Sequence, residues 1–164
     1  NAMAQAMTLS DGSLGYLAAI TSAEAQAFVQ ASVLPPTYDT ANYNQVWLGG
    51  RQAPGQTDPS ASWSWTNSGV CPECWDYTNW TTPGEPNDDG GINERFLTMW
   101  AQYLREGRDF RGTWNDSDDL ANINSRIIGM VVEWKDRTSA PEPGTAALAA
   151  LGMGLLALRG RRSR

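Results

Sequence analysis

The segment from Asn79 to Arg95 restricts the fold of this chain more than any other, and it reads NWTTPGEPNDDGGINER. It holds four carboxylates and three asparagines among two prolines and three glycines. Proline and glycine interrupt regular secondary structure, so the segment is predicted to be a loop. Because its carboxylates repel one another and no hydrogen-bond ladder holds them, the loop needs another source of stabilisation.

A bound calcium ion is one such source. Ca²⁺ takes six to eight oxygen ligands, mainly carboxylates and carbonyls, at roughly 2.3 to 2.6 Å, and a cation between close carboxylates relieves their repulsion. An amide and carboxylate pair, Asn115 and Asp116, follows Trp114 further along the chain and offers more ligands. The loop is therefore interpreted as a calcium site. A solvated acidic turn remains the alternative, because turns use the same residue types.

Charge and composition exclude several classes of function. The 164 residues carry a formal net charge of -6, which argues against nucleic-acid binding, because a phosphate-binding face needs clustered Lys and Arg. The chain has no histidine, so the commonest general base, the usual zinc ligand and every nucleophile paired with histidine are missing. The length fits one domain.

The two cysteines, Cys71 and Cys74, are separated by two residues. A zinc knuckle needs a second pair, and a thioredoxin-type motif needs a βαβ context that this loop does not offer. A local disulfide in an exported protein is therefore predicted, with free thiols as the alternative.

Sequence patterns predict two helices and several short strands. Residues 1–7 are rich in alanine and predict a short helix, and a capping-box pattern at Thr21 to Glu24 predicts a second helix from about Ser22 to Ala31. The predicted strands are Gln45–Gly50, Trp63–Trp65, Arg95–Met99, Phe110–Trp114 and Ile127–Trp134. The stretch from Thr66 to Asn93 has no periodic pattern, and a loop of that length is expected only where it is functional.

Several motifs together resemble the C-type lectin domain. These are Glu85-Pro86-Asn87 followed by Glu94, then Trp114-Asn115-Asp116, with Gly15 to Glu24 and Val46 to Gly50 upstream in the order that the family uses. The resemblance implies an α+β, C-type lectin-like fold over residues 1–135, with two helices, small antiparallel sheets and a long calcium-binding loop. It also implies that the first and last strands of the domain pair.

The resemblance implies a site in which one Ca²⁺ and a sugar share the same protein ligands. Two vicinal sugar hydroxyls replace water on the ion, and a cis peptide bond before Pro86 turns both flanking side chains onto it. The Glu-Pro-Asn motif implies mannose-type or glucose-type sugars. The residues expected to bind both metal and carbohydrate are Glu85, Asn87, Glu94, Asn115 and Asp116, and Asp88 is a candidate for a second calcium site.

The chain departs from the family pattern at three places. Glu94 lies nine positions after Glu85 rather than eight, so Asn93 is an alternative ligand unless Gly90-Gly91 absorb one residue. The N-terminal strand is missing from the sequence, which is expected to expose an edge near residues 131–134. The long-range disulfides of the family are replaced by apolar positions, so packing must hold the loop.

The aromatic residues divide into two expected groups. Trp75, Tyr77 and Trp80 lie in the loop and are candidates for stacking on a sugar ring. The residues expected in the core are Trp47, Trp65, Trp100 and Trp114.

The composition changes after Lys135. Residues 136–140 form a predicted linker, and residues 141–164 contain a Pro-Glu-Pro-Gly motif, an apolar run from Thr145 to Leu158 and a basic end. A helix over that run would be about 21 Å long, short of the ~30 Å of a bilayer core. The order resembles the PEP-CTERM sorting signal of Gram-negative bacteria.

The sorting signal implies export, transient membrane anchoring and cleavage by an exosortase-type enzyme, as for other removable anchors. The mature protein is then expected in the cell envelope or the extracellular matrix. A permanent single-pass or packed C-terminal helix is the alternative.

The leading functional hypothesis is calcium-dependent binding of carbohydrate, either an exopolysaccharide or a cell-surface glycan, by a protein that is not an enzyme. A calcium-independent adhesion or protein-binding module on the same fold is the alternative. A glycosidase that uses Glu85 and Glu94 as paired carboxylates is a third hypothesis. It is disfavoured because both residues lie on one loop and a metal would compete for them.

Overall fold

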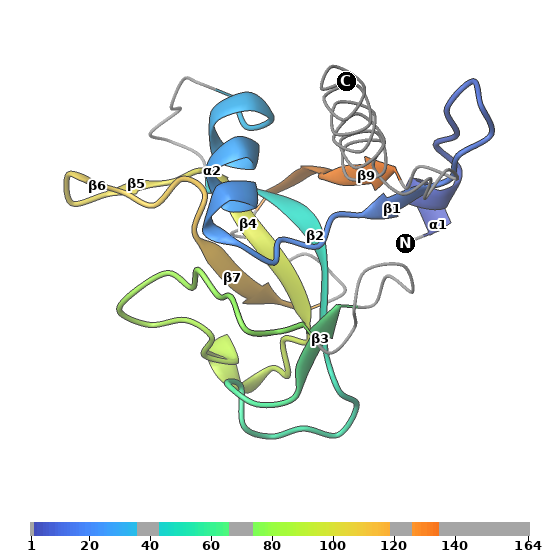
Figure 1. Cartoon of the computed structure of the whole chain (residues 1–164). Coiled ribbons are helices and arrows are strands. Elements are labelled where there is room, and N and C mark those ends of the chain that lie inside the picture. Colours follow the sequence, from blue (N-terminus) through green and yellow to red (C-terminus); the bar gives the residue numbers. More distant parts are fainter. Residues whose placement is uncertain (1, 36–42, 66–73, 119–125, 135–164) are drawn as a thin grey trace, which may run out of the picture.

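The chain has an α+β architecture in the computed structural model, which describes residues 2–35, 43–65, 74–118 and 126–134 (Figure 1). The helices are α1 (Ala2–Gln5), α2 (Ala23–Ser32) and the 3-10 helix η1 (Asp89–Gly91). The strands are β1 (Gly15–Leu17), β2 (Asn44–Gln52), β3 (Trp63–Trp65), β4 (Phe96–Gln102), β5 (Leu104–Arg105), β6 (Arg108–Asp109), β7 (Trp114–Ser117), β8 (Arg126–Met130) and β9 (Val132–Trp134). The predicted fold class, with two α-helices and small sheets, is confirmed.

Strand β2 is the centre of the main sheet, whose order is β3-β2-β4-β7. It pairs antiparallel with β3 and β4, and β8 runs parallel to its first half. Gly50 lies so close to β4 that a Cβ atom there would stand 2.7 Å from Leu97 Cδ2. Glycine is therefore required at this position for the two strands to pair at this spacing.

The last predicted strand is in fact two strands in two sheets. β8 pairs with β2, whereas β9 pairs antiparallel with β1, with Gly15 opposite Trp134. Val131 separates the two strands, is buried, and donates from its N–H to Trp47 O at 3.0 Å. The prediction of an exposed edge at residues 131–134 is therefore wrong, because β1 pairs with β9.

Helix α2 begins as its capping pattern predicts. The Ser22 side chain accepts a hydrogen bond from Ala25 N at 3.2 Å. Inside the helix, Gln26 is buried and makes two bonds to the strand region across from it: its Nε2 donates to Gly112 O at 2.8 Å, and its Oε1 accepts from Trp114 Nε1 at 2.9 Å. One polar side chain thereby fixes the helix against the start of β7.

Tryptophan packing replaces long-range disulfides in holding the loop. Trp114 is fully buried, and the ring centroids of Trp65, Trp75, Trp80 and Tyr77 each lie 5.8 Å from its own. The three loop aromatics, which are candidates for stacking on a sugar ring, are partly buried and pack against the core, and none of the three lines the polar pocket at Glu85 and Glu94.

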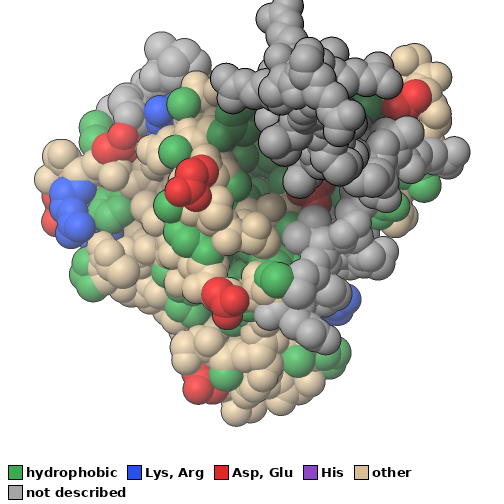
Figure 2. All heavy atoms as spheres, viewed as in Figure 1, with side chains coloured by type: hydrophobic (Ala, Val, Ile, Leu, Met, Phe, Trp, Pro, Cys, Tyr) green, Lys and Arg blue, Asp and Glu red, His purple; other side chains and the backbone are tan. Residues whose placement is uncertain are grey.

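In the region after β4, one predicted strand is misplaced and one hairpin was not predicted. The strand predicted from Phe110 to Trp114 begins only at Trp114 and continues to Ser117. The chain before it forms a hairpin, β5–β6, that the sequence did not indicate. At the hairpin turn, Glu106 and Gly107 have φ of 52° and 75°. Basic side chains gather at this hairpin (Figure 2).

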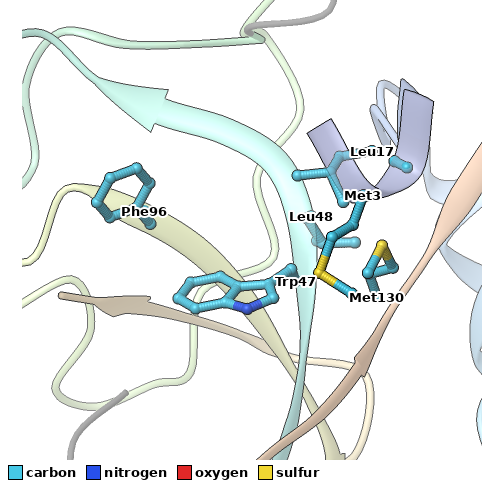
Figure 3. Close-up of a pocket in the computed structure, with 7 residues that line it drawn as sticks. Met3, Leu17, Trp47, Leu48, Phe96 and Met130 are labelled. Atoms are coloured by element: carbon cyan, nitrogen blue, oxygen red, sulfur yellow. The ribbon is translucent and has the colours of Figure 1, made fainter. Parts of the chain in front are cut away.

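An apolar pocket of about 280 Å³ lies between α1 and the main sheet (Figure 3). Its lining residues are Met3, Ala4, Leu17, Trp47, Leu48, Phe96 and Met130. Trp47, expected in the core, is only half-buried because it faces this pocket.

Two predictions fall partly outside the described residues. The local disulfide involves Cys71, which lies in residues 66–73, so the pairing stays a prediction. The apolar run from Thr145 to Leu158 also lies outside them. Within the described ranges, no helix is long and apolar enough to cross a membrane.

Candidate functional site

The start of the acidic loop lies along strand β7. Trp114 N donates to Asn79 O at 2.8 Å, and Thr81 N donates to Trp114 O at 2.9 Å. The Thr81 hydroxyl also contacts Trp114 O and accepts from Trp100 Nε1 at 3.0 Å. These bonds fix the loop beside β7 just before the residues that carry the charges.

The Pro86 bend and the end of β7 converge at Asp116. The peptide bond between Glu85 and Pro86 is cis, as the resemblance implied. Asp116 is fully buried, and its Oδ2 accepts from Asn87 N at 2.9 Å and from Asp88 N at 3.0 Å. The structure therefore brings together the two distant acidic segments that the sequence pointed to.

Glu94 lies in the same cluster, whereas Asn93 does not. Glu94 Oε2 accepts from Asp89 N at 3.0 Å, and its own N–H donates to Asp88 Oδ1 at 2.8 Å. Asn93 is exposed and its Nδ2 donates to Gln56 O at 2.6 Å, outside the acidic pocket. The 3-10 helix η1 (Asp89–Gly91) lies between Asp88 and Glu94.

The carboxylates of this cluster are in an unfavourable electrostatic environment. Burial, and after it repulsion from Asp116, raises the pKa of Glu85 to about 8. Burial is also the main cause that raises the pKa of Glu94 to about 7 and that raises the pKa of Asp116. Glu85 Oε2 and Asp116 Oδ1 are buried and no donor group of the described residues meets them, so these neighbouring carboxyls are compatible only if a proton or a cation lies between them. A positive charge or a donor at this place would relieve both problems.

These side chains surround a small polar pocket of about 160 Å³. The residues that line it are Glu85, Asn87, Asp89, Glu94, Trp100, Tyr103 and Asn115. The Asn115 Nδ2 donates to the Asp116 carbonyl. Asp88, the candidate for a second site, has its Oδ1 engaged by Glu94 N. Among the described residues, no group of three or more His, Cys, Asp and Glu side chains has the arrangement of a metal centre.

Sequence reasoning missed Asp89 and Tyr103 as residues of the pocket wall, and it placed Trp100 correctly in the core without recognising that it also lines the pocket. Asp89 was taken only as part of the acidic run, although it lies beside Glu94. Trp100 was expected in the core, and it is 6% exposed, yet its ring also lines the pocket. Tyr103 was not considered, because its region showed no recognisable strand pattern.

The C-terminal end of the chain belongs to a known class of sorting signal. Residues 139–164 match the PEP-CTERM protein-sorting motif. This motif marks exported proteins that are processed at the C-terminal end, so the predicted signal and the predicted location are confirmed. It implies a processing enzyme of the exosortase type as a partner.

Solved structures similar to this chain are C-type lectins. The C-type lectin CEL-I from Cucumaria echinata is 20% identical, with 73% of this chain and 71% of that chain covered and a TM-score of 0.47. CEL-IV is 29% identical, with 70% and 68% covered and a TM-score of 0.43. The mouse scavenger receptor C-type lectin carbohydrate-recognition domain is 24% identical, with 63% and 62% covered and a TM-score of 0.39. No curated protein matches the chain.

Proposed function

We propose that this exported protein binds carbohydrate through a calcium ion held between the Pro86 bend and the end of β7. The observation that supports the proposal most is the pair of buried carboxyl oxygens, Glu85 Oε2 and Asp116 Oδ1, that no donor group of the described residues meets; a proton shared between the two carboxyls is the alternative to a cation. Buried carboxylate oxygens are costly unless a donor or a cation meets them. Oxygen atoms of this kind are what Ca²⁺ prefers as ligands.

The proposed ligands are four residues that line the polar pocket and a fifth, Asp116, that belongs to the same carboxylate cluster but does not line the pocket. When bound, Ca²⁺ supplies a positive centre on which two vicinal sugar hydroxyls can replace water. The carboxylates then accept hydrogen bonds from these hydroxyls and the asparagine amides donate to them. The residues proposed to bind ion and sugar are Glu85, Asn87, Glu94, Asn115 and Asp116, with Asp88 as a candidate for a second ion.

The size of the pocket supports a small ligand. Pockets for drug-sized ligands span roughly 300 to 1,000 Å³, whereas this one holds about 160 Å³. We therefore propose that it takes one sugar residue of an exopolysaccharide or a cell-surface glycan. Mannose-type or glucose-type sugars, which the Glu-Pro-Asn motif implies, are the first to test.

The proposed organisation follows the change in composition along the chain. Residues 1–135 form the binding module, residues 136–140 a linker, and residues 141–164 the sorting and anchor segment that is removed.

A calcium-independent adhesion or protein-binding module is the second candidate, and a specific observation favours it. Asp116 Oδ2 and Glu94 Oε2 already accept backbone N–H groups, so the loop is partly satisfied without an ion. Such a module would show no thermal response to calcium and would tolerate Glu85→Ala. A glycosidase is disfavoured, because Asp116 joins Glu85 and Glu94 in one cluster, which suits a cation better than two carboxylates across a scissile bond.

Retention on mannose resin tests the proposal and separates Glu94 from Asn93. We expect the full chain to be retained in calcium and released by a chelator. Glu94→Gln is expected to weaken calcium binding by about tenfold or more, because it removes a charged ligand. Asn93→Ala is the matched control and should behave like the wild type, because Asn93 contacts Gln56 outside the pocket. Equal retention of wild type and Glu94→Gln, with and without chelator, would contradict the proposal.

A further inference from the structure

The hairpin β5–β6 extends the fold next to the acidic pocket and begins with an aromatic group. The Tyr103 ring lies 4.4 Å from Trp100, 4.9 Å from Phe110 and 5.1 Å from Tyr43, measured between ring centroids. Phe110 N donates to Tyr103 O at 2.9 Å, so the backbone at the base of the hairpin is also fixed. Tyr103 is half-buried, which leaves part of its side chain accessible.

Trp100 gives this aromatic group a rigid support. It is nearly fully buried, and its Nε1 donates to the Thr81 hydroxyl at 3.0 Å. Tyr103 packs against this ring, so it has a rigid neighbour on one side.

Trp100 and Tyr103 line the same pocket as Glu85, Glu94 and Asn115. The lining of the pocket therefore combines aromatic rings with carboxylates and amides. A pyranose has matching chemistry, because its hydroxyls form a polar edge and its ring C–H groups form apolar faces. Aromatic rings contribute large apolar contact area at little conformational cost.

We infer that Tyr103, supported by Trp100, is a specificity-determining residue that packs on the C–H face of the sugar whose hydroxyls reach the carboxylate cluster. This inference rests on the proposed function of the site. It adds that the ligand is a pyranose with one unobstructed apolar face, oriented by the hairpin rather than by the loop aromatics. Sugars with a bulky axial substituent on that face are then excluded.

The test measures calcium response and sugar affinity separately in the full-length protein. The probes are calcium alone, followed by melting temperature, and methyl β-glucopyranoside in calcium, followed by titration calorimetry, because the substituents of this sugar are all equatorial and leave both ring faces open. The variants are Tyr103→Ala and Tyr103→Phe, with Phe28→Ala as control, because Phe28 is an aromatic residue on α2 that is 64% exposed. Saturation-transfer NMR identifies which sugar protons contact the protein.

Tyr103→Ala is expected to bind the sugar roughly three- to tenfold more weakly, the usual range for one aromatic contact, with the calcium response unchanged. Tyr103→Phe and Phe28→Ala should keep wild-type affinity, and the strongest saturation transfer should fall on protons of one ring face. If Tyr103→Ala binds the sugar as the wild type does while calcium still stabilises both, the inference is overturned and the proposed function stands. If the wild type responds neither to calcium nor to the sugar, the proposed function fails and the inference falls with it.

Discussion

Calcium at about 10 mM is expected to raise the melting temperature of the wild-type protein by about 4 to 10 °C, and Glu85→Gln is expected to remove that rise. Extracellular calcium modules bind with dissociation constants of roughly 10⁻⁴ to 10⁻³ M, which at this concentration stabilises the fold by about 1.4 to 2.7 kcal/mol. A domain of this size shifts its melting temperature by a few degrees per kcal/mol. Differential scanning calorimetry with calcium, and again after adding a chelator, measures the effect.

The same substitution has the opposite effect when calcium is absent. Glu85 lies beside Asp116 in the same cluster, and its raised pKa of about 8 means that its charge is present only in more alkaline solution when calcium is absent. At about pH 9, replacing the carboxylate by a neutral amide removes one of the repelling charges, so Glu85→Gln should melt a few degrees above the wild type in chelator. Glu106→Gln is the control, because it removes the same charge from a side chain that is 81% exposed. A Glu85→Gln variant that responds to calcium as the wild type does would show that Glu85 is not a ligand.

Trp114→Ala is expected to be the most destabilising single substitution in the core, at about 3 to 5 kcal/mol. Trp114 is fully buried between the sheet and the long loop, with other rings packed around it. The substitution would leave a cavity. It would also leave the buried Gln26 Oε1 without the hydrogen bond that it accepts from the indole N–H. Because whole domains are stable by only about 5 to 15 kcal/mol, the variant is expected to unfold at far lower urea concentration.

A matched truncation separates this effect from a general loss of aromatic surface. Phe28→Ala removes a ring that is 64% exposed and should change stability by about 0.5 kcal/mol or less. Trp114→Phe keeps part of the packing and should fall between the two. Similar urea midpoints for Trp114→Ala and Phe28→Ala would mean that the tryptophan cluster does not hold the loop.

Local chemistry made some elements predictable from sequence. The Ser22 cap fixes the start of α2 because its hydroxyl accepts a hydrogen bond from the backbone N–H three residues later. This capping signal involves only residues that are close in the sequence. The Glu85-Pro86 bend and the Asn115-Asp116 pair were recognisable as motifs, and they do converge through Asp116 and the backbone of the loop. These features depend on a few neighbouring residues, so a single sequence carries them.

Other elements depend on distant partners and could not be predicted. The β-branched residues from Ile127 onward are compatible with one long strand or with two short ones. The chain divides at Val131 because the residues before it pair with β2 and the residues after it pair with β1. Gly112 has φ of 86° and makes the turn that delays β7, with Gln30 so close that a Cβ would lie 2.7 Å from its side chain. The hairpin strands, Leu104–Arg105 and Arg108–Asp109, are only two residues long, so no periodicity marks them.

Anomalous diffraction from crystals grown with calcium is the most direct test of the convergence of these two segments on one ion. The predicted result is a single strong peak bonded at roughly 2.3 to 2.6 Å to side-chain oxygens of both Glu85 and Asp116. A peak bonded only to the Asp88-Asp89 turn, or no peak in the pocket at a calcium concentration that saturates ordinary extracellular sites, would contradict it.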